Sequence, residues 1–146
     1  MLISGVAVAD CPDLGGRYTC PQTGWDRGAI NIELKRQSGY VYYQWYRAQN
    51  NQTDLYILSP KPTVKSKKGN IIILGSNYCE QGQFLSKSEW IDITIPGDSS
   101  KFQELLRHAF LDEKGDLVLL SELWFKDRRG DPGYDQLRVI CPRVKP

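Results

Sequence analysis

The chain has 146 residues, the usual size of one domain, and its 40% hydrophobic and 25% charged content is typical of a globular protein, which argues against disorder. A formal net charge of only +2, from 19 basic and 17 acidic residues, argues against a dedicated nucleic-acid binder. No stretch approaches the roughly 20 apolar residues of a membrane-spanning helix, so we expect no membrane span.

The first ten residues are expected to stand apart from the domain. Residues 2–9 are a short apolar run, and Ala7-Val8-Ala9 fits the small-x-small pattern of a signal-peptide cleavage site. A charged n-region is missing, and the same run also fits a first strand. We expect residues 1–10 to be a signal-peptide remnant or an N-terminal extension, and residues 11–146 to form one β-barrel domain.

Short runs of alternating polarity separated by turn residues predict β-strands along most of the chain. The clearest hairpin joins residues 29–36 to residues 40–48 across a Gln37-Ser38-Gly39 turn. Further strands are expected, in chain order, at 16–20, 54–59, 70–75, 78–85, 90–95, 117–125 and 134–141. The Lys- and Pro-rich residues 60–68 and the charged residues 126–133 are expected to be loops.

Residues 100–110 fit two different predictions. Hydrophobic residues recur at helical spacing from Phe102 to Phe110, and Ser100 with Gln103 fits a capping box. The same segment also leads into a hairpin whose turn is residues 112–116. At most one short helix is therefore expected near 100–110.

The order of these elements predicts the architecture. Eight to ten consecutive strands joined by hairpins form an antiparallel up-and-down meander, which either closes into a barrel or folds into a sandwich. Because closure removes exposed strand edges, we predict an all-β barrel of eight to ten strands.

The cysteines predict disulfides in a secreted or periplasmic protein. There are four of them (Cys11, Cys20, Cys79 and Cys141), without the close C-x-x-C pairs of zinc sites. His108 is the only histidine, so no metal site is expected.

In a closed meander with an even number of strands, the first and last strands are antiparallel neighbours. Cys20 ends the first and Cys141 ends the last, so the two should lie at opposite ends of the barrel, beyond the roughly 7 Å that a disulfide allows between Cα atoms. We therefore predict Cys11–Cys141 and Cys20–Cys79. The rival pairing is Cys11–Cys20 with Cys79–Cys141.

The opening Asp13-Leu14-Gly15-Gly16-Arg17-Tyr18, the long meander and Arg138 in the last strand resemble the lipocalin-type, or calycin, β-barrels. In that group an opening Gly-x-Trp places an aromatic ring at the base of the barrel, and a late arginine packs across it. Tyr18 holds the aromatic position here. The resemblance implies a barrel with a small-molecule cavity and no catalysis.

The aromatic segment 40–46 carries most of the candidate ligand-binding residues. On a strand, alternation places Tyr40, Tyr42 and Tyr46 on one side. Val41, Tyr43 and Trp45 are then on the other. Outward rings offer stacking platforms for sugars, bases or peptide side chains, and the alternative is cross-strand packing. The candidates are Tyr40, Tyr42, Tyr43, Trp45, Tyr46 and Trp124.

Other motifs are short. The basic residues of 61–68 and 126–129 fit either an anion-binding rim or solvated loops. Arg129-Gly130-Asp131 matches the integrin-type tripeptide, although a turn explains it equally well. Glu80 and Asp92 could form an acid pair, but their spacing does not single them out. No Gly-x-Ser-x-Gly nucleophile elbow is present either. We therefore predict no catalytic residue and no cofactor.

The leading hypothesis is an exported, non-enzymatic binding module that holds a small apolar or amphipathic ligand inside the barrel. The alternative is a secreted or envelope interaction protein, an inhibitor or a glycan binder, that uses surface aromatics and basic loops. An apolar cavity of roughly 300 Å³ or more would favour the first, and a solidly packed barrel the second. The sequence leaves the ligand and the oligomeric state undetermined.

Overall fold

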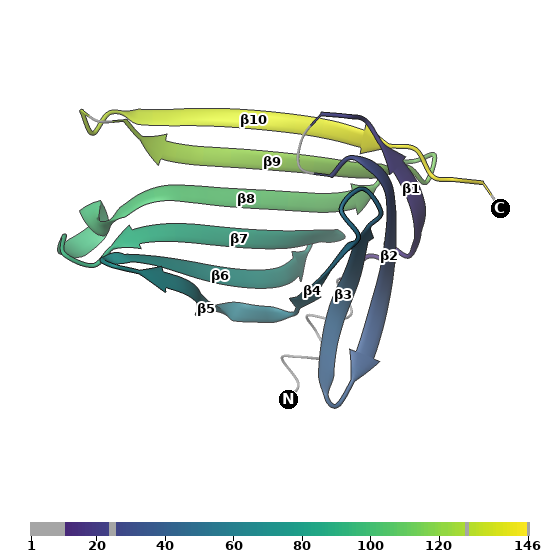
Figure 1. The fold of residues 1–146 in the computed structure, drawn as a ribbon, viewed down its shortest axis with the longest axis horizontal. Helices are drawn as coiled ribbons and strands as arrows, with labels where there is room; N and C mark the ends of the chain where they lie inside the picture. The colour runs from purple at the N-terminus through teal and green to yellow at the C-terminus, as the bar shows by residue number, and fades with distance from the viewer. Residues whose placement is uncertain (1–10, 24–25, 128, 146) are drawn as a thin grey trace.

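The computed structural model describes residues 11–23, 26–127 and 129–145 (Figure 1). The predicted signal remnant or extension, residues 1–10, lies outside the described residues. Ten strands follow one another in the described part of the chain: β1 (Gly16–Cys20), β2 (Gly28–Gln37), β3 (Tyr40–Arg47), β4 (Gln52–Ile57), β5 (Ser59–Lys68), β6 (Ile71–Glu80), β7 (Gln83–Asp92), β8 (Lys101–Leu111), β9 (Leu117–Lys126) and β10 (Pro132–Cys141). One 3-10 turn, η1 (Gly97–Ser100), lies between β7 and β8. No helix in the part of the chain that the structure describes is long and apolar enough to cross a membrane.

The strands form two antiparallel sheets with meander connectivity. One sheet has four strands in the order β1-β2-β3-β4, and the other has six in the order β10-β9-β8-β7-β6-β5. The four-stranded sheet crosses one end of the six-stranded sheet, near the point where β10 finishes (Figure 1). The all-β antiparallel prediction is thus confirmed. Neither sheet, as traced over the described residues, closes into a barrel.

Of the two predictions for residues 100–110, the strand is the one observed, because residues 101–111 form β8. This strand pairs with β7 on one side and β9 on the other. Both of its faces carry large hydrophobic side chains. Leu105 and Leu106, for example, point to opposite faces, and both are half-buried. A strand with apolar residues on both faces has the same sequence pattern as a helix. Only the hydrogen-bonded pairing of β8 with β7 and β9 distinguishes the strand from the helix.

Two further strand boundaries differ from the prediction. The expected loop 60–68 is the edge strand β5, whose register shifts between Ser59 and Thr63 and between Val64 and Ser66. Prolines and lysines are tolerated on such an irregular edge strand. Residues 70–75 and 78–85 were expected to be two separate strands. Instead, β6 runs continuously through both regions to Glu80, and the end of the second region is the start of β7. The turn between β6 and β7 is Gln81-Gly82, where both residues have positive φ.

The core lies between the four-stranded sheet and the nearer half of the six-stranded one. Tyr18, Ile30, Ile32, Tyr43 and Trp45 come from the small sheet, and Cys79, Phe84, Ala109, Leu117, Val139 and Cys141 from the large one. Strand alternation places the first set on one face, as the sequence predicts for Ile30, Ile32, Tyr43 and Trp45.

The predicted disulfide pairing is wrong. The disulfides are Cys11–Cys79, with a Cα–Cα distance of 5.0 Å, and Cys20–Cys141, with 4.3 Å. The chain continues past Cys141 beside β1, where Tyr18 and Arg143 form an antiparallel bridge. The backbone N–H of Thr19 donates to the carbonyl of Pro142 over 2.9 Å.

The two strands are therefore antiparallel, as expected, but they are not aligned end to end. β1 has only five residues and lies beyond the end of β10. This stagger brings Cys20 opposite Cys141.

Candidate functional site

The inward face of the six-stranded sheet is built from rows of cross-strand partners, because antiparallel register places paired residues on the same face. The row within the core is Cys79, Phe84, Ala109, Leu119 and Val139. The next row, here called the polar row, is Asn77, Ser86, Arg107, Ser121 and Leu137. Two more rows, here called the distal rows, follow. They are Gly75, Ser88, Leu105, Leu123 and Asp135, then Ile73, Trp90, Gln103, Phe125 and Gly133.

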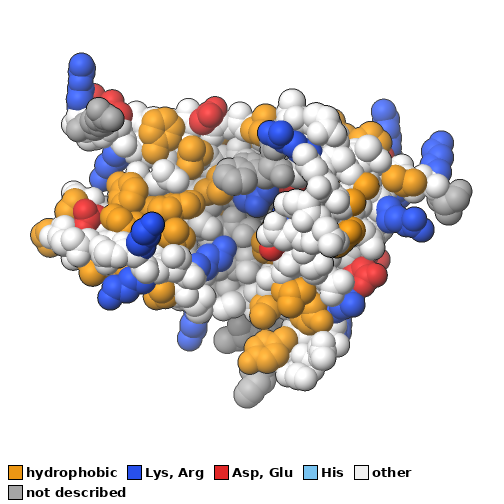
Figure 2. Space-filling view, in the orientation of Figure 1, with side chains coloured by type: hydrophobic (Ala, Val, Ile, Leu, Met, Phe, Trp, Pro, Cys, Tyr) orange, Lys and Arg blue, Asp and Glu red, His pale blue; other side chains and the backbone are white. Residues whose placement is uncertain are grey.

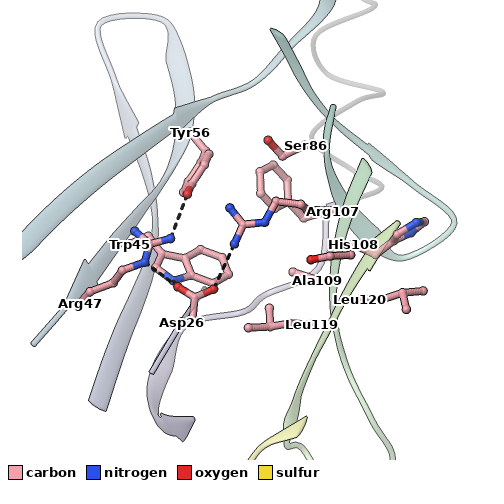
Figure 3. A pocket seen from close by; sticks show the side chains of 12 residues that line it. Asp26, Trp45, Arg47, Tyr56, Ser86, Arg107, His108, Ala109, Leu119 and Leu120 are labelled. Carbon is pink, nitrogen blue, oxygen red and sulfur yellow. Dashed lines mark hydrogen bonds and ion pairs between the residues drawn. The ribbon is translucent and has the colours of Figure 1, made fainter. Parts of the chain in front are cut away.

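A small cavity lies between the two sheets beside the polar row (Figure 3). Its volume is about 30 Å³, far below the roughly 300 Å³ of a small-molecule cavity. Asp26, Trp45, Arg47 and Tyr56 line it from one side, and Phe84, Ser86, Arg107, Ala109, Leu119 and Ser121 from the other. This cavity therefore has room for about one water molecule.

A buried ion network crosses this cavity. The Asp26 carboxylate accepts hydrogen bonds from Arg47 Nε at 2.6 Å and from Trp45 Nε1 at 3.2 Å, both at Oδ1. Arg107 Nη2 lies 3.4 Å from Oδ2 of the same carboxylate. Breaking such a buried network by removing one partner is costly, because it leaves an uncompensated charge.

Arg47 is the centre of the network. Its guanidinium also pairs with Asp54 and donates to the Tyr56 hydroxyl at 3.1 Å. Burial alone would lower the pKa of Arg47, but interactions with Tyr56 and Asp26 outweigh it and raise the pKa. Arg47 therefore stays charged inside the fold.

Lys65 approaches the polar row from the edge strand β5. Its aliphatic stem lies across Gly75, where an added Cβ would collide with it, and its Nζ is 3.5 Å from Ser88 Oγ. Burial and the positive charge of Arg107 lower the pKa of Lys65. Within the described part of the chain, no salt bridge joins Lys65 to a carboxylate.

The distal rows extend beyond the cover of the small sheet. Ile73, Trp90, Leu105 and Leu123 are half-buried and outside the core, and Phe125 is 36% exposed. Hydrophobic side chains gather over this part of the large sheet, beside a hollow between the sheets (Figure 2). An open groove of about 310 Å³, with Phe102, Trp124 and Phe125 among its walls, lies at the far end.

The predicted aromatic residues do not converge on one pocket. Tyr43 is fully buried and its hydroxyl donates to the carbonyl of Pro12 at 2.6 Å, while Trp45 lines the cavity. On the opposite face, the Tyr42 hydroxyl donates to Gln37 and that of Tyr46 to Asn51. The remaining two candidates are exposed, Tyr40 at the start of β3 and Trp124 on β9, with its ring 5.3 Å from that of Tyr134.

The sequence analysis missed Asp26, Arg47 and Arg107. They come from three separate segments, so no local motif joins them. Strand alternation does place Arg47 on the same face as Tyr43 and Trp45. A charged residue on the apolar face of a strand was the available signal.

His108 lies on the outer face of β8 and points away from the cavity (Figure 3). Its ring nitrogens contact Gln83 Oε1 at 3.0 Å and Glu122 Oε2 at 2.7 Å. Tyr134 donates to the other oxygen of Glu122 at 2.9 Å, and this hydrogen bond raises the pKa of Tyr134. This chain of contacts ties four strands together, from β7 to β10.

Other chemical groupings are absent or dispersed in the residues that the structure describes. Glu80 and Asp92 sit at opposite ends of the β6–β7 hairpin, because Glu80 pairs with Gln83 and Asp92 with Ile71. No group of three His, Cys, Asp or Glu side chains there has the arrangement of a metal site.

The tripeptide Arg129-Gly130-Asp131 lies in the β9–β10 hairpin loop, and the β8–β9 loop has the same hydrogen-bond pattern. In the β9–β10 loop, Asp127 Oδ1 accepts hydrogen bonds from the backbone N–H groups of Arg129 and Asp131. In the β8–β9 loop, Asp112 does the same for Lys114 and Asp116. The repeated pattern explains the tripeptide as turn chemistry.

Tyr18 is fully buried at the base of the small sheet, and the guanidinium of Arg143 packs over its ring at 4.9 Å. Arg143 also donates to the Tyr18 hydroxyl at 2.9 Å and to the carbonyl of Gly15 at 3.0 Å. The arginine over the aromatic ring is therefore Arg143, whereas Arg138 is exposed on β10.

In the comparisons with known proteins, no family model matches the chain and no curated protein matches its sequence.

Proposed function

We propose that the protein is an exported, non-enzymatic binding module in which an elongated apolar or amphipathic small molecule lies along the distal rows. One observation carries this proposal: apolar side chains continue along the inward face of the large sheet beyond the core, where Ile73, Trp90, Leu105 and Leu123 are half-buried and Phe125 is 36% exposed. The cavity beside the polar row is too small for such a ligand, so the ligand occupies the open side between the sheets.

Two further observations support parts of the proposal. The packing of Arg143 over Tyr18 beside Gly16 supports a relation to the calycin barrels, in a version whose two sheets remain open toward the ligand. The two disulfides support export to a secreted or periplasmic location, because disulfides persist in oxidising compartments.

Binding of the neutral dye Nile red tests the proposal. Leu105→Gln replaces an apolar side chain of the distal rows and is expected to weaken dye binding about tenfold, since burying such a side chain is worth roughly 1.5–3 kcal/mol. The matched control is Leu106→Gln, also half-buried but on the outer face of the same strand. Equal affinities in both variants, or no binding by the unmodified protein, would contradict the proposal.

A second candidate function, glycan binding, rests on the exposed ring pair of Trp124 and Tyr134, which are 37% and 50% exposed. Exposed aromatic rings provide stacking surfaces for sugars. A glycan array with Trp124→Ala as its control distinguishes this candidate. Glycan signals that persist in Trp124→Ala would reject it.

A further inference from the structure

The polar row separates the core from the distal rows, so the inward face of the large sheet changes character along its strands. Core side chains are followed by an amide, two hydroxyls and a guanidinium, from Asn77, Ser86, Ser121 and Arg107. Leucines and aromatic residues come next. A surface of this kind matches a molecule with a polar head and an apolar chain.

Positive charges gather beside the polar row. Three cations, Arg47, Arg107 and Lys65, lie in this region with the carboxylates of Asp26 and Asp54. Asp26 is engaged mainly by Arg47, at 2.6 Å, and is 3.4 Å from Arg107. Basic side chains are visible within the hollow (Figure 2).

The acid of the distal rows lies at the far edge of the sheet. Asp135 is on β10, whereas Lys65 is on β5, and β6, β7, β8 and β9 separate them. At about 4.8 Å per strand, more than 20 Å lies between these two edges. Asp135 therefore does not balance Lys65.

Two features position the Lys65 side chain: an irregularity in its own strand β5 and the glycine opposite it on β6. The irregularity between Val64 and Ser66 interrupts the edge-strand register at Lys65, and the missing side chain of Gly75 makes room for its stem. The ammonium thereby lies 3.5 Å from Ser88 Oγ in the distal rows, while Lys65 itself remains exposed. An anionic group bound there can accept a charge-assisted hydrogen bond from it.

We propose that the ligand is an anionic single-chain amphiphile, whose carboxylate or phosphate head binds Lys65 and Arg107 while its chain lies over Leu105 and Leu123. This inference rests on the proposed function and adds the chemical class of the ligand. The head contacts the two cations, and the chain covers the apolar part of the distal rows.

Calorimetry with a matched set of probes tests the inference: decanoate, decyl phosphate, decanol and inorganic phosphate alone, below the concentrations at which micelles form. The two anionic chains are expected to bind about tenfold more tightly than decanol, because hydrogen bonds between oppositely charged groups are stronger than those to a hydroxyl. Lys65→Met should reduce that ratio about fivefold or more and leave decanol binding unchanged.

Two variants complete the design. Lys67→Met, on the same strand but paired with Ile72 of the opposite face, is the matched control and should keep the full ratio. Gly75→Ala should lower the ratio while retaining the lysine, because its Cβ displaces the Lys65 stem. Circular dichroism verifies that each variant is folded.

The outcomes are distinguishable. Equal binding of decanol and decanoate would overturn the anionic head but leave the proposed function intact. No binding of any chain would overturn both. Inorganic phosphate binding as tightly as decyl phosphate would indicate a site for a free anion and overturn the amphiphile. An equal loss in Lys67→Met and Lys65→Met would attribute the preference to general surface charge and overturn the assigned site.

Discussion

Arg143 joins three segments that are distant in sequence. Its guanidinium donates to the carbonyls of Gly15 and Gly115, each at 3.0 Å, and packs against Tyr18. Arg143→Met keeps the stem but removes these hydrogen bonds, so we expect the free energy of unfolding to fall by about 2–3 kcal/mol. Urea unfolding measures this change.

The control is Arg138→Met, at an exposed position of β10. It should change stability by less than about 0.5 kcal/mol. If the two variants are equally stable, Arg143 does not hold the termini together.

Tyr43 predicts how stability responds to alkaline pH. Burial, followed by the charge of Asp13, raises the pKa of its hydroxyl above the ordinary 10.0. A raised pKa means that the folded state holds this proton more tightly than the unfolded state. The stabilisation is therefore complete below pH about 10 and is lost as the pH rises above it.

Tyr43→Phe removes this linkage, so its free energy of unfolding should fall less steeply between pH about 9 and 11 than that of the unmodified protein. Some slope remains, because burial also raises the pKa of Tyr18, partly opposed by Arg143. Urea midpoints across the pH series provide the measurement. Identical slopes for the two proteins would show that Tyr43 makes no contribution.

At the scale of elements, the two similar loops are closed by an aspartate and a glycine with positive φ. Gly115 has a φ of 84° and Gly130 a φ of 85°, and nothing lies within 4 Å of a Cβ added at Gly130. Gly130→Ala should therefore cost only the left-handed backbone strain, about 1–2 kcal/mol.

Gly130→Asn should cost less than Gly130→Ala, because asparagine tolerates the left-handed region. Thermal unfolding of both variants checks the order. A larger loss for the asparagine variant would mean that side-chain contacts, rather than φ, determine the residue at this position.

For the whole molecule, the disulfides connect the chain ends to distant strands. Cys20–Cys141 spans 121 residues and Cys11–Cys79 spans 68. In the chain-entropy model, removing the first with Cys20→Ala/Cys141→Ala costs about 5 kcal/mol, and removing the second costs about 4 kcal/mol. Urea unfolding of the two double variants should show that order.

Peptide mapping without reduction verifies the pairing itself. It should yield a Cys20–Cys141 peptide and a Cys11–Cys79 peptide. A Cys11–Cys141 peptide would contradict the stagger of β1 against β10 that the backbone bridges between residues 17–19 and 142–144 define.

Local chemistry in the sequence determined the strands and their faces. Alternation in residues 29–36 and 40–48 predicted the hairpin, its turn, and the shared side of Tyr43 and Trp45, because side chains alternate across any strand. The segment 101–111 was harder to assign, since apolar residues on both faces imitate a helix. The even set of cysteines indicated disulfides, although not their partners.

Only the tertiary structure decided how distant strands align. The stagger of β1 paired Cys20 with Cys141 and brought Arg143, rather than Arg138, over Tyr18. Sheet register likewise set Arg107 in the polar row, and the irregular edge strand brought Lys65 to Ser88 in the adjoining distal row. Such contacts depend on the register between strands far apart in the chain, which packing of the two sheets sets and which no local pattern of residues encodes.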